Sequence, residues 1–151
     1  MSSGDNRMDN LTPEDRSWCM SQIRSKGMKP ELAVRSMVHR LGYRFRLHRH
    51  DLPGRPDIVL PRHKSVIFVN GCFWHWHPAD DCPIAGLPKS NIQYWKPKLA
   101  RTRKRDLEHA VSLKDKGWRV LTVWECQLRN PVEVLDEIHR FLGTVSNAVP
   151  E

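Results

Sequence analysis

The sequence predicts an α/β fold in a single domain, and three observations carry this prediction. Segments whose apolar residues recur every three or four positions, as in amphipathic helices, alternate with short apolar runs that are typical of buried strands. The chain has 151 residues, a length that fits one domain. Neither an internal repeat nor a low-complexity linker divides it. We therefore expect a single domain over residues 12–145, between flexible ends at residues 1–11 and 146–151.

Two helices are expected first. The segment TPED at residues 12–15 offers a threonine N-cap, a proline at the first helical position and acids in the first turn. A second helix is expected from Pro30 until Gly42, which can end it. The apolar residues of this helix share one face: Val34, Met37, Val38 and Leu41.

Strands and two further helices follow. Residues 43–48 alternate apolar with basic side chains, as in a half-buried strand. The runs DIVL (57–60) and SVIFV (65–69) are joined by the polar PRHK, which indicates a hairpin. A helix over residues 97–116 closed by Gly117, a strand at 118–124 and a capped helix at 130–142 complete the chain. The predicted order is ααβββαβα.

Charge and composition favour a polyanion as partner. The chain has 25 Lys and Arg against 17 Asp and Glu, a formal charge of +8. Such an excess of cations favours nucleic acid, because each phosphate that is neutralised releases counterions. No apolar run approaches the ~18 residues of a membrane span, and the first ten residues lack the apolar core of a signal peptide. We therefore expect a cytoplasmic protein with no membrane partner.

Cysteines and histidines in VIFVNGCFWHWHPADDC (residues 66–82) predict a metal site. Cytoplasmic cysteines stay reduced, so they serve as metal ligands, core residues or reactive thiols. Cys126 and Cys72 each follow a predicted strand, so neighbouring strands can present both thiolates at one sheet end. A structural zinc site is therefore predicted, against ordinary reduced cysteines, on Cys72, His77, Cys82 and Cys126. Cys19 is expected to be an inert packing residue.

Two further residues can carry hydrolytic chemistry. Asp57 starts a strand after the turn LPGRP, where a carboxylate can hold Mg²⁺ or simply cap the turn. His75 is a candidate general base, because histidine side chains exchange protons near neutral pH, although a histidine so near a zinc ligand can also be a supporting group.

Aromatic and basic residues offer a surface for nucleic acid. Phe73, Trp74 and Trp95 can be core, but the first two lie in a polar loop, from which they can stack on bases or enter a duplex. Lys98, Arg101 and Arg105 form a cationic stripe along one helix, suited either to a phosphate backbone or to plain solvation.

Together these segments resemble the very short patch repair (Vsr) endonuclease family. The resemblance extends over nearly the whole globular chain, and its most specific motifs are GCFWH and GWRVLTVWEC. It implies a restriction-endonuclease-like fold of the PD-(D/E)xK type, with a central mixed sheet flanked by helices and a structural zinc. It also implies an Mg²⁺-dependent nick on the 5′ side of the thymine in a T:G mismatch, which arises when 5-methylcytosine deaminates. Double-stranded DNA would be the partner, at a nucleoid-associated location, with mismatch-repair proteins as candidate further partners.

The resemblance also assigns roles to single residues. Asp57 and the backbone carbonyl of Val69 would bind Mg²⁺, and Glu31 would support this site. His75 would activate the attacking water, and Asp106 would orient and polarise His75. The aromatic residues that would wedge into the duplex are Phe73, Trp74 and Trp95.

Two positions depart from the family. Val69 replaces a threonine, which matters little if only its carbonyl is used, and the other position is Asn70. The best-known members have a histidine where this chain has Asn70, whose carboxamide can bind a phosphate oxygen but cannot shuttle a proton. Two alternatives stay open from the residues alone: a restriction-type nuclease of the same fold, and a non-catalytic zinc-stabilised DNA-binding module.

Overall fold

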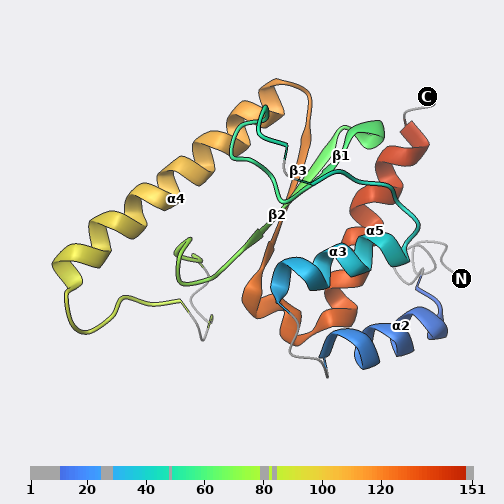
Figure 1. Cartoon of the computed structure of the whole chain (residues 1–151), viewed down its shortest axis with the longest axis horizontal. Helices are drawn as coiled ribbons and strands as arrows, with labels where there is room; N and C mark the ends of the chain where they lie inside the picture. The colour runs from blue at the N-terminus through green and yellow to red at the C-terminus, as the bar shows by residue number, and fades with distance from the viewer. Residues whose placement is uncertain (1–10, 25–28, 48, 79–81, 83–84, 149–151) are drawn as a thin grey trace, which may run out of the picture.

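The computed structural model describes residues 11–24, 29–47, 49–78, 82 and 85–148. Its sheet is mixed and has three strands among these residues: β1 (Ile58–Leu60), β2 (Ser65–Asn70) and β3 (Arg119–Trp124). β2 is the central strand, antiparallel to β1 and parallel to β3. Helix α4 (Ile92–Asp115) lies on one side of the sheet, and α3 (Pro30–Arg40) and α5 (Pro131–Ala148) lie on the other (Figure 1).

The N-terminal helices form as predicted. Helix α2 (Pro13–Cys19) begins with a complete capping box, because the Thr12 hydroxyl accepts from the Asp15 amide at 3.0 Å and the Asp15 carboxylate accepts from the Thr12 amide. A π-helical turn, η1 (Met20–Arg24), continues it. Helix α3 ends before Gly42, whose φ of 90° suits glycine. Leu11, placed by prediction in the tail, is buried in the core, so the packed chain starts one residue earlier. The rest of that tail, and residues 149–151, lie outside the described residues.

The hairpin is confirmed, but the strand predicted over residues 43–48 is wrong. Its described residues pair only through one bridge, in which Arg46 and Val59 exchange backbone hydrogen bonds of 2.7 and 2.9 Å. β1 has three residues, and Val59 is its middle one, so little strand is available for pairing. The predicted alternation of burial still holds, because Tyr43 and Phe45 pack on the core while Arg44 is exposed.

Helix α4 begins at Ile92 and not at Pro97, which corrects a second prediction. Pro97 lacks an amide hydrogen and leaves the carbonyl of Gln93 without that helical partner, a loss that falls in the first turns. Contacts of the Trp95 ring with aromatic rings of the loop after β2 hold this early part of α4 in place. The last helix, α5, begins at Pro131 as predicted but continues to Ala148, beyond the predicted end at residue 142 and into the segment 146–151 that was predicted to be a flexible end.

Two apolar clusters use opposite faces of the sheet. Ile58, Leu60 and Ile67 pack with α3 and α5 in the larger one, while Val59 and Val66 pack with Leu113 of α4 in the smaller one. Neighbouring residues of a strand point to opposite faces, so each short strand is buried on both. None of the described helices combines the length and apolar character needed to cross a membrane.

All three strands bring functional segments to one edge of the sheet. Asp57 precedes β1, Asn70 ends β2 and Trp124 ends β3, where a 3-10 helix, η3 (Glu125–Arg129), follows. Because β2 and β3 are parallel and β1 is antiparallel to β2, these three residues lie at the same edge. The loop at residues 71–78 leaves from this edge.

Candidate functional site

Four ligand-type side chains meet beyond the ends of β2 and β3. Their ligand atoms lie within 4.8 Å of one another, and they are the four predicted ones: Cys72, His77, Cys82 and Cys126. The parallel pairing explains the approach of Cys72 to Cys126, because Asn70 is paired with Trp124 and each cysteine follows two residues later. The predicted meeting of these four residues is thus confirmed, and such a cluster can hold a metal ion.

Local hydrogen bonds keep this cluster compact. The His77 amide donates to the Cys72 carbonyl at 2.9 Å, which folds the loop so that both side chains reach the same point. The Cys126 amide donates to the Cys72 Sγ at 3.3 Å, and the His77 Nδ1 lies 3.5 Å from the Cys126 Sγ. The His77 ring stacks on Trp124 with centroids 4.1 Å apart. The sequence did not single out Trp124 for this role, and only the strand pairing could have placed it there.

The donor set fits a soft or borderline cation. Burial raises the pKa of the Cys72 thiol to about 12, and burial also raises the pKa of Cys126. A thiolate at this place therefore requires a compensating positive charge, which a metal ion supplies. Cys19 lies apart in the core of the N-terminal helices, fully buried, as the packing prediction expected.

A second cluster surrounds Asp57. The Asp57 Oδ2 accepts a hydrogen bond of 2.7 Å from the Val69 amide, which fixes the carboxylate across the start of β1 and the end of β2. Burial raises the pKa of Asp57, the nearby charge of Glu31 raises it further, and His75 and Arg35 act in the opposite direction. The charges of Glu31 and His75 thus act on Asp57 from other segments of the chain. Carboxylates are the ligand type that a hard cation such as Mg²⁺ prefers.

His75 and Asp106 form a pair across 31 positions of sequence. The His75 Nδ1 lies 2.6 Å from the Asp106 Oδ2, and about a third of each side chain is exposed. A carboxylate that accepts from Nδ1 favours the tautomer whose Nε2 carries no proton. Such an imidazole can take a proton from water at Nε2. Helix α4 supplies the aspartate, so the predicted pairing depends on the packing of α4 against the loop at residues 71–78.

Three aromatic rings pack together outside the core. The ring centroids of Phe73 and Trp74 are 5.1 Å apart, those of Phe73 and Trp95 5.3 Å, and those of Trp74 and Trp95 5.7 Å. Trp74 is 55% exposed. Tyr94, which was not predicted as a site residue, extends the group with its centroid 5.0 Å from that of Trp95. The rings therefore form a partly exposed aromatic group, and Phe73 and Trp74 of this group directly precede His75 in the chain.

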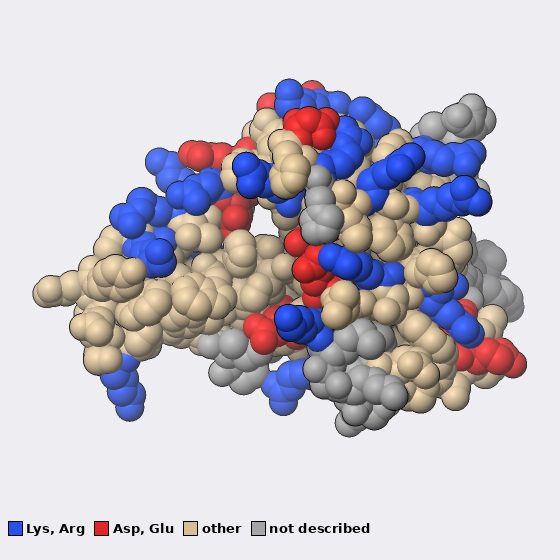
Figure 2. All heavy atoms as spheres, viewed as in Figure 1, with Lys and Arg blue, Asp and Glu red and all other residues tan. Residues whose placement is uncertain are grey.

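Basic side chains accompany this group along α4. Arg101 and Arg105 are exposed, and the half-buried Lys98 lies over the Tyr94 ring at 5.9 Å. Figure 2 shows Lys and Arg side chains along one edge of α4, beside a broad surface of uncharged residues. Arg103, which was not predicted, lies over the Trp76 ring at 5.9 Å. The predicted stripe is thus present on the surface, and nothing in the structure tests its contact with DNA.

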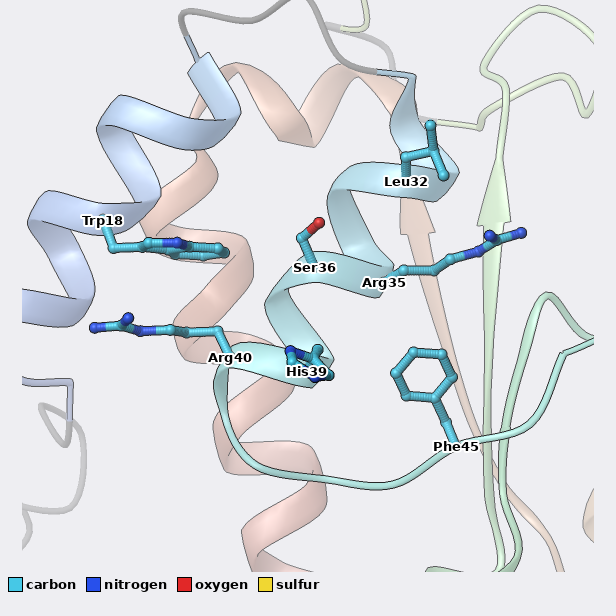
Figure 3. Close-up of a pocket in the computed structure, with 7 residues that line it drawn as sticks. All are labelled: Trp18, Leu32, Arg35, Ser36, His39, Arg40 and Phe45. Carbon is cyan, nitrogen blue, oxygen red and sulfur yellow. The ribbon is translucent and has the colours of Figure 1, made fainter.

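Asn70, at the end of β2, and Arg35, on α3, are two further polar residues near the Asp57 cluster. Asn70 is 8% exposed at the end of β2, so its carboxamide is largely withdrawn from solvent. Arg35 lies one helical turn after Glu31 and pairs with it, a contact that the sequence spacing of four could have indicated. Arg35 also borders a cavity of about 640 Å³ between α2, α3 and residues 43–47 (Figure 3), whose other lining residues are Trp18, Leu32, Ser36, His39, Arg40 and Phe45. That cavity lies apart from the aromatic group.

Comparisons with known proteins found a matching family model and several similar proteins. The family model described as "DNA mismatch endonuclease Vsr" matches residues 8–82. The chain is 54% identical over 120 residues to "Type II nicking enzyme V.XorIIP" of Xanthomonas oryzae pv. oryzae, covering 80% of this chain and 86% of that relative. It is 36% identical over 141 residues to "Type II nicking enzyme V.NmeAIP" of Neisseria meningitidis serogroup A, covering 93% and 99%. It is 37% identical over 122 residues to "DNA mismatch endonuclease Vsr" of Escherichia coli K12, covering 81% and 76%.

Proposed function

Because the chain belongs to the Vsr family of DNA mismatch endonucleases, we propose that it nicks one strand of duplex DNA at a T:G mismatch. The cut falls on the 5′ side of the thymine and requires Mg²⁺. We also propose that the fold built on its mixed sheet is restriction-endonuclease-like. The observation that carries it is the His75–Asp106 pair of 2.6 Å beside Asp57, next to exposed aromatic rings.

Each polar residue of the site has a separate role in the proposed hydrolysis. Asp57 would hold Mg²⁺ through its carboxylate, with the Val69 carbonyl and Glu31 as the further oxygen groups of that site. When bound there, the ion would supply Lewis-acid stabilisation of negative charge on the phosphoryl group. His75 takes the proton of the attacking water at Nε2, and Asp106 stabilises the imidazolium that forms. Asn70 at the end of β2 is a hydrogen-bond donor for a phosphate oxygen and takes no proton.

The aromatic rings and α4 position the substrate. Phe73, Trp74 and Trp95 enter the duplex beside the mismatch, where a wobble pair costs less to unstack than a Watson–Crick pair. Lys98, Arg101 and Arg105 contact the phosphate backbone and make binding depend on salt. This division puts base recognition on the rings and affinity on the helix.

Zinc is the metal proposed for the Cys3His cluster. A closed tetrahedral set of three thiolates and one imidazole suits a structural Zn²⁺, which has no open position for substrate. Its ligands flank the aromatic pair, with Cys72 before Phe73 and His77 after His75. Zinc would therefore hold the loop that carries both the wedge and the general base. A hand-over of DNA by mismatch-repair proteins, and a cytoplasmic location on the nucleoid, stay predictions.

A strand-specific nicking assay tests the proposal. End-labelled duplexes that differ only in one pair, T:G, T:A or C:G, are incubated with and without Mg²⁺ across a panel of flanking sequences. We expect one nick on the 5′ side of the thymine, only in the T:G duplex and only with Mg²⁺. Equal cutting of the matched duplexes would favour a restriction-type nuclease. Tight binding without any cut would favour a binding module.

A further inference from the structure

Arg35 pairs with Glu31, one acid of the proposed Mg²⁺ site, and its charge also acts on Asp57, the other acid. Its Nη2 lies 2.5 Å from the Glu31 Oε2, and about a quarter of its side chain is exposed. After burial, which acts most strongly, the charges of Glu31 and Arg35 shift the pKa of Asp57 in opposite directions. Figure 3 shows the Arg35 side chain leaving α3 towards the end of β2, away from Trp18 and Arg40.

The guanidinium of Arg35 is incompletely satisfied. Its Nε is buried and has no hydrogen-bond acceptor among the residues that the structure describes. A buried donor without an acceptor destabilises the fold and is uncommon in native proteins. Arg35 therefore occupies a position that packing alone does not explain, at the edge of a cluster of acids.

We propose that Arg35 makes metal loading depend on DNA: its charge weakens the hold of the free enzyme on Mg²⁺ and strengthens its hold on the scissile phosphate. This inference rests on the proposed function. Asp57 and Glu31 supply two negative charges, and Arg35 supplies one positive charge. Mg²⁺ leaves this set with an excess of one positive charge, and the phosphate of bound DNA cancels it. The remaining titratable neighbour of Asp57 is His75, which is paired with Asp106.

Two affinities measured on one variant test this role. Arg35→Met removes the charge and keeps much of the side-chain length. Calorimetry with Mg²⁺ alone, on zinc-loaded protein without DNA, should show affinity about tenfold higher than wild type, because a repulsive unit charge near a divalent ion is gone. Binding of a T:G duplex in buffer freed of Mg²⁺ should be about tenfold weaker, because an attraction to phosphate is gone. A merely structural role would weaken both.

Control variants isolate the charge. Arg35→Lys keeps the charge and should stay near wild type in both measurements. Arg40→Met removes an arginine from the same helix, one that pairs with Asp15 at 3.1 Å and borders the same cavity, and should leave the Mg²⁺ affinity unchanged. An Arg35→Met protein whose Mg²⁺ affinity is unchanged or lower would overturn the proposal. If the wild-type protein did not prefer the T:G duplex in the nicking assay, the proposed function would be wrong instead, since neither affinity depends on selective cutting.

Discussion

Replacing Trp74 with alanine separates recognition of DNA from stability of the fold. A fully buried tryptophan costs roughly 3–5 kcal/mol when truncated to alanine. Trp74 is 55% exposed and makes T-shaped ring contacts with Phe73 and Trp95. Slightly less than half of its surface is therefore available to lose, so we expect about 1–2 kcal/mol. For a chain of this size such a loss lowers the melting temperature by roughly 2–8 °C. The ratio of nicking rates on the T:G and T:A duplexes should fall sharply, because the proposed wedge is gone.

The assay pairs thermal melting with nicking of T:G and T:A duplexes, and Trp118 is the matched control. Trp118 is 9% exposed at the start of β3, where it packs in the smaller apolar cluster. Trp118→Ala should lose the full roughly 3–5 kcal/mol and keep its selectivity in the protein that remains folded. The reasoning would be refuted if Trp74→Ala melted as low as Trp118→Ala while it still discriminated between the duplexes. That result would make Trp74 a core residue.

Three further predictions concern the two clusters and the isolated thiol. Metal analysis of protein purified without added zinc should find about one equivalent, and Cys126→Ser should lose it together with thermal stability, since the metal contributes to folding; soluble, active protein without zinc would exclude this role. Asp57→Ala should abolish nicking and keep T:G binding, while His75→Ala should slow nicking at least ~10²-fold; near-normal turnover in either variant would reassign the site. Burial raises the pKa of Cys19 to about 11, so a thiol reagent at pH 8 should modify it only after unfolding, and rapid labelling of the native protein would contradict its buried position.

Local patterns were sufficient for most elements and for the metal cluster. The N-cap at Thr12 and the end of α3 before Gly42 depend on neighbouring residues, and both are confirmed. The meeting of Cys72 with Cys126 was also predictable, because parallel strands bring their carboxyl ends to one edge. The errors at residues 43–48 and at the start of α4 concern segments whose partners are far away in the chain. A strand needs a partner strand of sufficient length. A helix can begin before a proline when tertiary contacts stabilise its first turn more than the missing hydrogen bond of the proline destabilises it.

The sequence by itself determined which residues are available for chemistry: the Cys3His ligands, Asp57, His75 and the aromatic residues of one loop. Only the tertiary structure decided how they meet. Packing of α4 brings Asp106 to 2.6 Å from His75, and packing of α3 brings Glu31 and Arg35 to Asp57. The physical reason is that residue identity and spacing govern contacts within a helix turn or a strand pair. Contacts between elements depend instead on which apolar faces are buried together, and this choice belongs to the whole chain.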